Sequence, residues 1–426
     1  MTAPTSELMK TKQYTLKLIC WVFYDWANSA FPAIIQTFIF ASFFVNHVAV
    51  NETVGAAAWG TVTGLSAFVV ALVSPFLGAI ADQCGARRLW LISATLLCVI
   101  PTALLWFILP SPEYTWPALW GVGIGAVGAE GAYIFYNAML PELAAPKQLG
   151  RWSGWGWGMG YAGGMAALLV ALFAFVNDHP WFPLAGGQAE AVRATFVLTA
   201  VWYLFFALPL FLTAPPSIPS GKSMGVAVKD GLNQLWTTCK ELKHYRHIIR
   251  FLIAKMFYID GLATLFTFGG IYAASVFGMT QEEVLLFGIS MNVTAGLGAA
   301  SLAFLDDWIG SKKVILYSLI GLIIPGSFAL FVTEKWQFWL LGLLMCVFVG
   351  PVQSSSRALM SRMAPAHMRR QMFGFYMLSG KATAFVGPLL YGWVAYLTNS
   401  LRFGMSTIIL LFIIGGLILN RMKADE

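Results

Sequence analysis

The chain has 426 residues, of which 58% are hydrophobic and 11% are charged, and its formal net charge is +7. This composition excludes a soluble protein of such length, because too few polar side chains remain to cover a surface that faces water. The histidines and cysteines are scattered and have no metal-ligand spacing, so we expect no metal and no cofactor.

Twelve apolar segments are long enough to cross a bilayer, for which about 20 residues suffice. In chain order they lie near residues 18–46, 56–81, 89–110, 116–140, 152–176, 195–214, 248–276, 282–305, 314–333, 336–361, 371–397 and 400–421. The first follows a polar N-terminus without a small-residue cleavage site, which indicates a retained span and not a signal peptide. We therefore predict an all-α polytopic membrane protein with twelve transmembrane helices.

The basic residues are distributed unevenly between the two sides of the membrane. If the N-terminus is cytoplasmic, that side holds 19 of the 26 lysines and arginines, whereas the opposite side holds Arg193, Lys335 and Arg402. This is the positive-inside pattern, which predicts that both termini are cytoplasmic. It accounts for the positive charge without a nucleic-acid partner. We expect a monomer among membrane lipids, in a bacterial inner membrane.

The longest polar stretch, residues 215–247, follows the sixth span. It begins with prolines and continues with basic residues and with apolar residues at helical spacing. This pattern predicts a cytoplasmic linker that ends in a surface helix. We thus divide the chain into an N-terminal six-helix half, 1–214, the linker, 215–247, and a C-terminal six-helix half, 248–426.

A repeated loop motif supports this division. An acid, a glycine and a basic pair recur at an offset of 225 residues, first as Asp82, Gly85, Arg87 and Arg88, then as Asp307, Gly310, Lys312 and Lys313. Such groups can clamp neighbouring helix ends, so we predict a cytoplasmic gate formed by Asp82, Arg87, Arg88, Asp307, Lys312 and Lys313. A simple positive-inside turn is the alternative for either copy alone. The repeat resembles the loop signature of the major facilitator superfamily, which implies two six-helix halves.

Other motifs resemble one branch of that superfamily, the autophagy-related vacuolar amino-acid effluxers and their bacterial relatives. The matching stretches are YDWANSAF at 24–31, YNAMLP at 136–141, GPVQSSSR at 350–357, and SGKAT at 379–383 followed by GP at 387–388. They extend over both halves of the chain. The resemblance implies efflux or uptake of a solute such as an amino acid.

Six charged side chains lie inside predicted spans: Asp25, Glu130, Lys255, Asp260, Arg357 and Lys381. Each such charge costs about 2.5–3.5 kcal/mol at the bilayer centre. Three acids balance three bases, as a polar core that receives a charged or zwitterionic solute requires. The first half contributes only acids, so we expect the site at the interface between the halves.

Several polar residues share helical faces with these charges. Asn28 lies beside Asp25, Tyr133 and Asn137 follow Glu130 at helical spacing, and Gln353 precedes Arg357 by one turn. Arg357 can hold a carboxylate in a bidentate fork. We predict a substrate site formed by Asp25, Asn28, Tyr133, Asn137, Gln353, Arg357 and Lys381. Two alternatives stay open: Asp25 only bonds a neighbouring helix, or Arg357 extends to the cytoplasmic interface.

Glu130 and Asp260 lie near mid-depth and are the candidates for proton coupling. A carboxyl group at that depth is less costly when protonated, which suits reversible protonation. The alternative for Glu130 is a permanent ion pair with Lys381 or Arg357.

The sequence therefore predicts a secondary transporter that moves a small amino-acid-like solute by alternating access with proton coupling. The same fold could instead move a lipid or another metabolite. An enzyme is disfavoured, because the five histidines are scattered over loops and helix ends.

Overall fold

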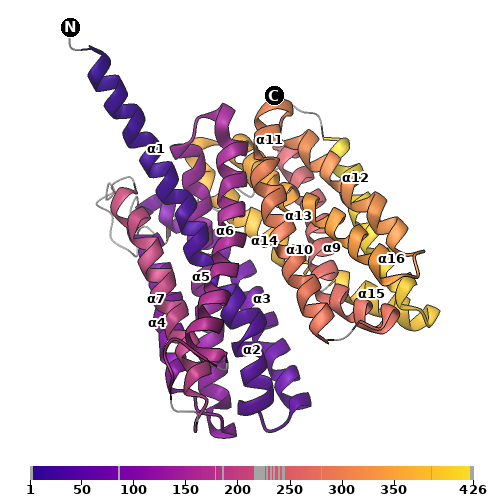
Figure 1. Ribbon diagram of the computed structural model, residues 1–426. Helices are drawn as coiled ribbons and strands as arrows, with labels where there is room; N and C mark the ends of the chain where they lie inside the picture. Colours follow the sequence, from indigo (N-terminus) through magenta and orange to yellow (C-terminus); the bar gives the residue numbers. More distant parts are fainter. Residues whose placement is uncertain are drawn as a thin grey trace. The chain divides into compact units, whose positions relative to one another are not determined.

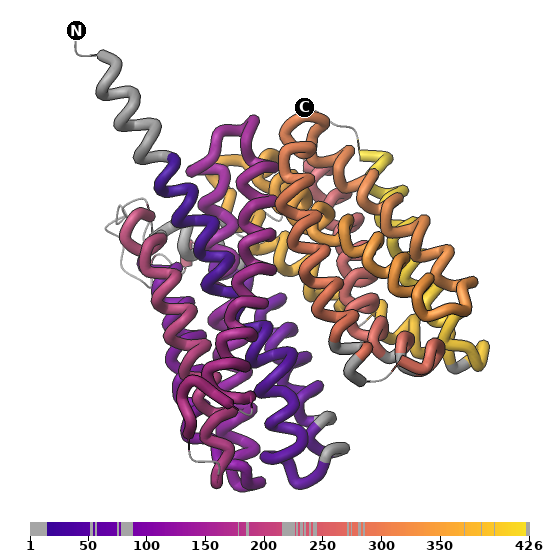
Figure 2. Tube along the Cα trace, viewed as in Figure 1, coloured from indigo at the N-terminus to yellow at the C-terminus, as the bar shows by residue number. Residues whose placement is uncertain are grey.

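The computed structural model describes residues 3–84, 87–177, 179–184, 187–214, 245–279, 281–384 and 386–422, with isolated positions between 226 and 241. These residues are mostly helical and contain no strand, which confirms the all-α prediction. Figure 2 draws in grey the residues whose placement is uncertain. The predicted surface helix of the linker falls for the most part outside the described residues.

The long helices follow one another along the chain (Figure 1). They are α1 (Ala3–Asn28), α3 (Glu52–Cys84), α4 (Arg87–Leu104), α5 (Thr115–Leu143), α6 (Leu149–Ala171), α7 (Glu190–Thr213), α9 (Arg246–Phe277), α10 (Gln281–Ser301), α12 (Ser311–Ala329), α13 (Lys335–Met363), α14 (Arg369–Lys381), α15 (Val386–Thr398) and α16 (Leu401–Asn420).

Shorter elements complete the connections and the ends of the spans. They are η1 (Phe31–Phe38), α2 (Phe40–Phe43), η2 (Phe44–Val48), η3 (Leu105–Phe107), η4 (Pro112–Tyr114), η5 (Pro146–Gln148), η6 (Leu172–Val176), α11 (Ala303–Ile309) and η8 (Ala366–Met368).

Ten helices within the described residues are long and apolar enough to cross a membrane. The chain is therefore a polytopic membrane protein, as its hydropathy predicts. The second predicted span corresponds to α3, in which residues 58–74 form a shorter apolar stretch.

The eleventh predicted span, near residues 371–397, is not one continuous helix. It consists of α14 and α15, and residues 382–384 between them form turns. The continuous helix expected from hydropathy is therefore wrong at this point. Pro388 explains part of the difference: it is the third residue of α15, a position where a missing N–H is tolerated because the first turn has no helical acceptor.

The described helices belong to two compact units. Unit 1 comprises Met1–Met139 and Met159–Gly231, and unit 2 comprises Leu140–Gly158 and Leu232–Glu426. Within unit 1, α7 packs against α1 and α4, while within unit 2 α13 packs against α10 and α12, and α16 against α9. The chain passes from one unit to the other inside α5 and again inside α6. The predicted halves, 1–214 and 248–426, stay a prediction.

Candidate functional site

In unit 1, Asp25 lies near the end of α1 in an aromatic environment and is 4% exposed. The Tyr136 hydroxyl donates a hydrogen bond to its Oδ2 at 2.7 Å. The indole of Trp21 donates to the Tyr136 carbonyl at 2.9 Å and stacks on the Tyr136 ring, with the centroids 4.4 Å apart. These contacts fix the carboxylate against α5, as one of the two alternatives for Asp25 requires.

The regular α-helix ends just beyond Asp25. Ser29 forms a turn, and its hydroxyl donates to the Asp25 carbonyl at 2.8 Å, before the π-helical η1 begins. Glycines of α6 allow close packing here: a Cβ on Gly163 would lie 2.5 Å from the Trp26 carbonyl oxygen. Asn28, the last residue of α1, is half-buried.

The structure places Glu130, Tyr133 and Asn137 on α5, in the same unit as Asp25. Asn137 is fully buried, whereas Glu130 and Tyr133 are half-buried. The rings of Tyr133 and Tyr136 lie 5.6 Å apart, so Tyr133 borders the aromatic environment of Asp25.

In unit 2, Arg357 on α13 is 1% exposed and binds the first part of α6. Its Nε donates to Ser153 Oγ at 2.9 Å and its Nη2 to the Ser153 carbonyl at 2.6 Å. Ser153 Oγ in turn donates to the Ser354 carbonyl at 2.7 Å. The guanidinium group therefore points into the protein and not toward the interface, against the alternative of snorkelling. Gln353, one turn earlier, is half-buried.

Lys255 on α9 is 4% exposed and contacts the second half of α14. Its Nζ donates to the Tyr376 carbonyl at 2.8 Å and to Ser379 Oγ at 3.3 Å, and it lies 3.9 Å from the centroid of the Tyr376 ring. This position favours an ammonium group, because the carbonyl oxygen and the ring face of Tyr376 both carry partial negative charge. Lys381, the last residue of α14, is half-buried.

Asp260 also lies on α9 and is 2% exposed. Thr264, one turn later, donates its hydroxyl hydrogen to the Asp260 carbonyl at 2.7 Å. Gly387 of α15 packs against this turn, since a Cβ there would lie 2.9 Å from the same carbonyl oxygen.

An ionic cluster in unit 2 contains one of the predicted gate residues. Asp307 accepts hydrogen bonds from the N–H groups of Gly150 and Arg151, at 3.0 and 3.2 Å, in the first turn of α6. That turn has free N–H groups and positive partial charge, so it favours a carboxylate. Arg362 bridges Asp307, at 3.3 Å, to the buried Asp306.

The other predicted gate residues have different surroundings. Lys312 donates to the carbonyl of Asn420 at 3.1 Å and to that of Met422, at the end of α16, and Lys313 is exposed. Arg88 is half-buried. The side chains of Asp82 and Arg87 lie outside the described residues. The structure thus brings Asp307 together with Arg362, whereas Lys312 lies against α16.

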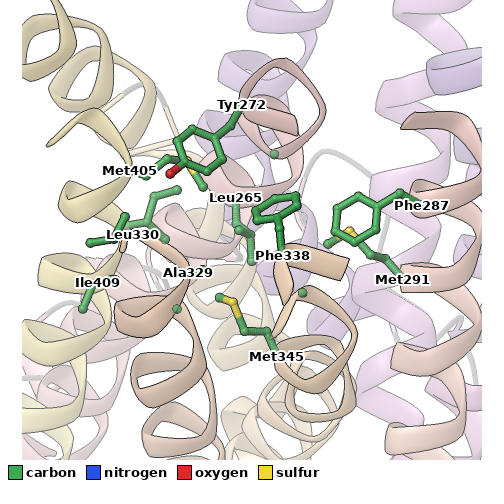
Figure 3. Close-up of a pocket in the computed structure, with 14 residues that line it drawn as sticks. Leu265, Tyr272, Phe287, Met291, Ala329, Leu330, Phe338, Met345, Met405 and Ile409 are labelled. Carbon is green, nitrogen blue, oxygen red and sulfur yellow. The ribbon is translucent and has the colours of Figure 1, made fainter. Parts of the chain in front are cut away.

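Unit 2 also holds an apolar cavity (Figure 3). Leu265, which follows Asp260 by five residues, is one of its lining residues, and five of the others are Tyr272, Phe287, Phe338, Met345 and Met405. Five residues span about 7.5 Å along a helix. The cavity therefore begins between one and two turns beyond Asp260.

Sequence reasoning did not assign roles to Ser153, Tyr136, Asp306 or Arg362. Tyr136 occurs in a matched motif, but neither Tyr136 nor Ser153 carries a charge that would single it out. Arg362 appears in the sequence only as one more cytoplasmic base. Its pairing with Asp306, 56 residues away, depends on the packing of α11 and α13.

Comparison with known proteins agrees with this architecture. The family model "Vacuole effluxer Atg22 like" matches residues 44–426. An uncharacterised MFS-type transporter of Bacillus subtilis, YxiO, is 28% identical over 412 residues, which are 96% of this chain and 95% of that protein. Autophagy-related protein 22 of Cryptococcus neoformans is 21% identical over 65% of this chain and 53% of its own length.

Solved structures show the same fold. The major facilitator transporter FucP, in its outward conformation, has a TM-score of 0.74 at 13% identity and covers 97% of this chain and 100% of its own. The proton:xylose symporter XylE has a TM-score of 0.74 at 14% identity, over 96% and 95% of the two chains. With the family match over most of the sequence, the chain belongs to the Atg22-like branch of the major facilitator superfamily, whose members are secondary transporters.

Proposed function

We propose that this transporter moves a small zwitterionic, amino-acid-like solute and couples its movement to protons. The observation that carries the proposal is the set of three acids and three bases within the membrane helices. Four of them, Asp25, Lys255, Asp260 and Arg357, are at most 4% exposed. Charges at such burial are kept in membrane proteins chiefly where they serve a solute or proton pathway.

The hydrogen bonds around two of these charges support the proposal. Tyr136 orients Asp25 in unit 1, and Ser153 orients Arg357 in unit 2. A solute with an ammonium and a carboxylate group is complementary to an oriented acid and an oriented guanidinium group. Asn28, Tyr133, Asn137, Gln353 and Lys381 are the proposed additional contacts.

A transport assay tests the substrate class. The purified protein in liposomes is expected to take up labelled amino acids from a broad panel, with rates that depend on an imposed pH gradient. Absence of both uptake and binding across the panel would reject the amino-acid proposal. The family and the fold would be unaffected by that result.

Glu130→Gln tests the coupling group. We expect the variant to lose proton-driven accumulation but to keep counterflow exchange, because exchange needs no net proton movement. Glu113→Gln, at an exposed position in η4, is the matched control and should behave as the parent protein. If accumulation is unchanged in Glu130→Gln, Glu130 is not the proton-coupling group and Asp260 becomes the candidate.

A second candidate is transport of a lipid or another metabolite by the same fold. Fluorescent lipid analogues in the same liposomes separate the two candidates.

We also propose, from the placement of the basic residues, that both termini are cytoplasmic and that the membrane is a bacterial inner membrane. Cysteine labelling of the termini in whole and opened cells tests that orientation.

A further inference from the structure

The break between α14 and α15 interrupts the helical hydrogen-bond ladder within a predicted membrane span. The N–H of Ala382 still bonds the Leu378 carbonyl at 2.8 Å, as in a helix. Beyond it, the N–H of Ala384 bonds the Lys381 carbonyl at 3.3 Å, three residues back, so the regular ladder has ended. Non-helical backbone at membrane depth is tolerated where it is buried in protein or lines a polar cavity.

Helix α9 packs closely on both sides of this break. A Cβ on Gly380 would lie 2.9 Å from Lys255 Nζ, and one on Gly387 would overlap Thr264 Oγ1. The two glycines therefore bring the turn of α9 that carries Asp260 against residues 382–384.

Two oxygen atoms at this contact have no hydrogen-bond partner among the described residues. They are Oδ1 of Asp260 and Oγ1 of Thr383, and both atoms are buried. The Thr383 hydroxyl lies beside the Asp260 carboxyl. Buried polar atoms of this kind are uncommon and indicate a missing ion or water.

The charges near the break include two lysines. Lys255 directs its ammonium group at Tyr376 and Ser379 of α14, and Lys381 ends that helix. Asp260 forms no salt bridge within the part of the chain that the structure describes. The carboxylate thus keeps an oxygen available to a cation while Lys255 lies at longer range.

We propose that Asp260 Oδ1, Thr383 Oγ1 and the main-chain carbonyls of Ala382 and Ala384 bind a sodium ion. A single carboxylate with hydroxyl and carbonyl oxygens suits a monovalent cation, whereas Ca²⁺ takes six to eight oxygen ligands. The partial negative charge at the C-terminal end of α14 adds attraction for a cation. Broken membrane helices bind coupling ions in this manner in other transporter folds.

Sodium binding is separate from the proposed function. It can be measured on the purified full chain without a transport assay. The test is thermal unfolding in detergent with sodium, potassium or choline chloride at equal ionic strength. We expect sodium alone to raise the unfolding midpoint, by a few degrees at saturation, since an ion that binds only the folded state stabilises it. An equal midpoint in the three salts would overturn the proposal.

Variants at the two side chains make the test specific. Asp260→Asn should abolish the sodium shift, and Thr383→Val should weaken the apparent sodium affinity at least about tenfold, whereas Thr383→Ser should retain it. Thr267→Val is the matched control, because Thr267 is exposed on α9, the helix that carries Asp260. Its hydroxyl bonds only the Ala263 carbonyl among the described residues. An undiminished sodium shift in both Asp260→Asn and Thr383→Val would reject the site.

Size-exclusion profiles establish that each variant is folded before its midpoint is compared. If Asp260→Asn is not folded, the sodium shifts of Thr383→Val and Thr383→Ser test the site without it. A sodium shift that persists while amino-acid uptake fails would reject only the proposed substrate class.

Discussion

Two buried acids of the membrane helices, Asp25 in unit 1 and Asp260 in unit 2, have contrasting surroundings. Asp25 accepts a hydrogen bond from Tyr136, whose ring is stacked on Trp21 and Tyr24. Asp260 lies against a broken helix, and its Oδ1 has no donor within the described residues. The first carboxylate is oriented by a tyrosine hydroxyl, whereas one oxygen of the second has no donor among the described residues.

The close contacts of glycines near the two acids also differ. Near Asp25, Gly163 of α6 approaches the main chain of Trp26, which cannot move without shifting a helix. Near Asp260, the atom nearest to Gly387 is the hydroxyl of Thr264, a side chain that can rotate, and the carbonyl oxygen of Asp260 is the next nearest. The contrast predicts that an added Cβ is accommodated less easily near the acid of unit 1 than near the acid of unit 2.

Among these variants, Tyr136→Phe should have the largest effect on stability. It removes the donor to Asp25 but keeps the aromatic stacking, so a buried carboxylate loses a charge-assisted hydrogen bond. We expect the free energy of unfolding to fall by about 3 kcal/mol. Denaturation in mixed detergent micelles, followed by tryptophan fluorescence, measures it.

Tyr133→Phe is the control for Tyr136→Phe, since Tyr133 lies on the same helix and its ring is only half-buried. A loss below about 1 kcal/mol for Tyr136→Phe, the size of a neutral hydrogen bond, would show that Asp25 does not depend on this contact.

Substitutions of Gly163 and Gly387 should have effects of intermediate size on stability. Gly163→Ala should lower the free energy of unfolding by about 2 kcal/mol, because its Cβ would press on main-chain atoms. Gly387→Ala should cost less, and Thr264→Ala should relieve part of that cost in the double variant, with a coupling of about 1 kcal/mol. Additive effects of Gly387→Ala and Thr264→Ala would contradict a direct contact.

Much of the fold was predictable, because a membrane span is a local property of about 20 residues. The charged residues could be found in the same way, since each stands out against an apolar segment. Their partners could not: Arg357 meets Ser153 across 204 positions of sequence. Only the packing of α6 against α13 brings these two residues together.

The break after Lys381 shows a different limit. Residues 382–384 are Ala-Thr-Ala, which contain no residue that stops a helix, so hydropathy predicts one continuous span. The usable signal is Pro388, which fits the first turn of a new helix better than the interior of an old one. Likewise, Lys312 and Asp307 share a motif, yet they bind α16 and α6 respectively.

Asp260→Asn should have the smallest effect on stability, and it compares the two acids directly. In buffer without sodium, the amide replaces a carboxylate whose Oδ1 has no donor in the described structure, so little favourable contact is lost. We expect the free energy of unfolding to change by less than about 0.5 kcal/mol. The same change at the other acid, Asp25→Asn, should cost about 1.5 kcal/mol, because a charge-assisted hydrogen bond becomes a neutral one. Parallel denaturation curves of the two variants measure the difference. Equal losses at both positions would mean that Asp260 is held as firmly as Asp25, and the contrast between the two units would then be wrong.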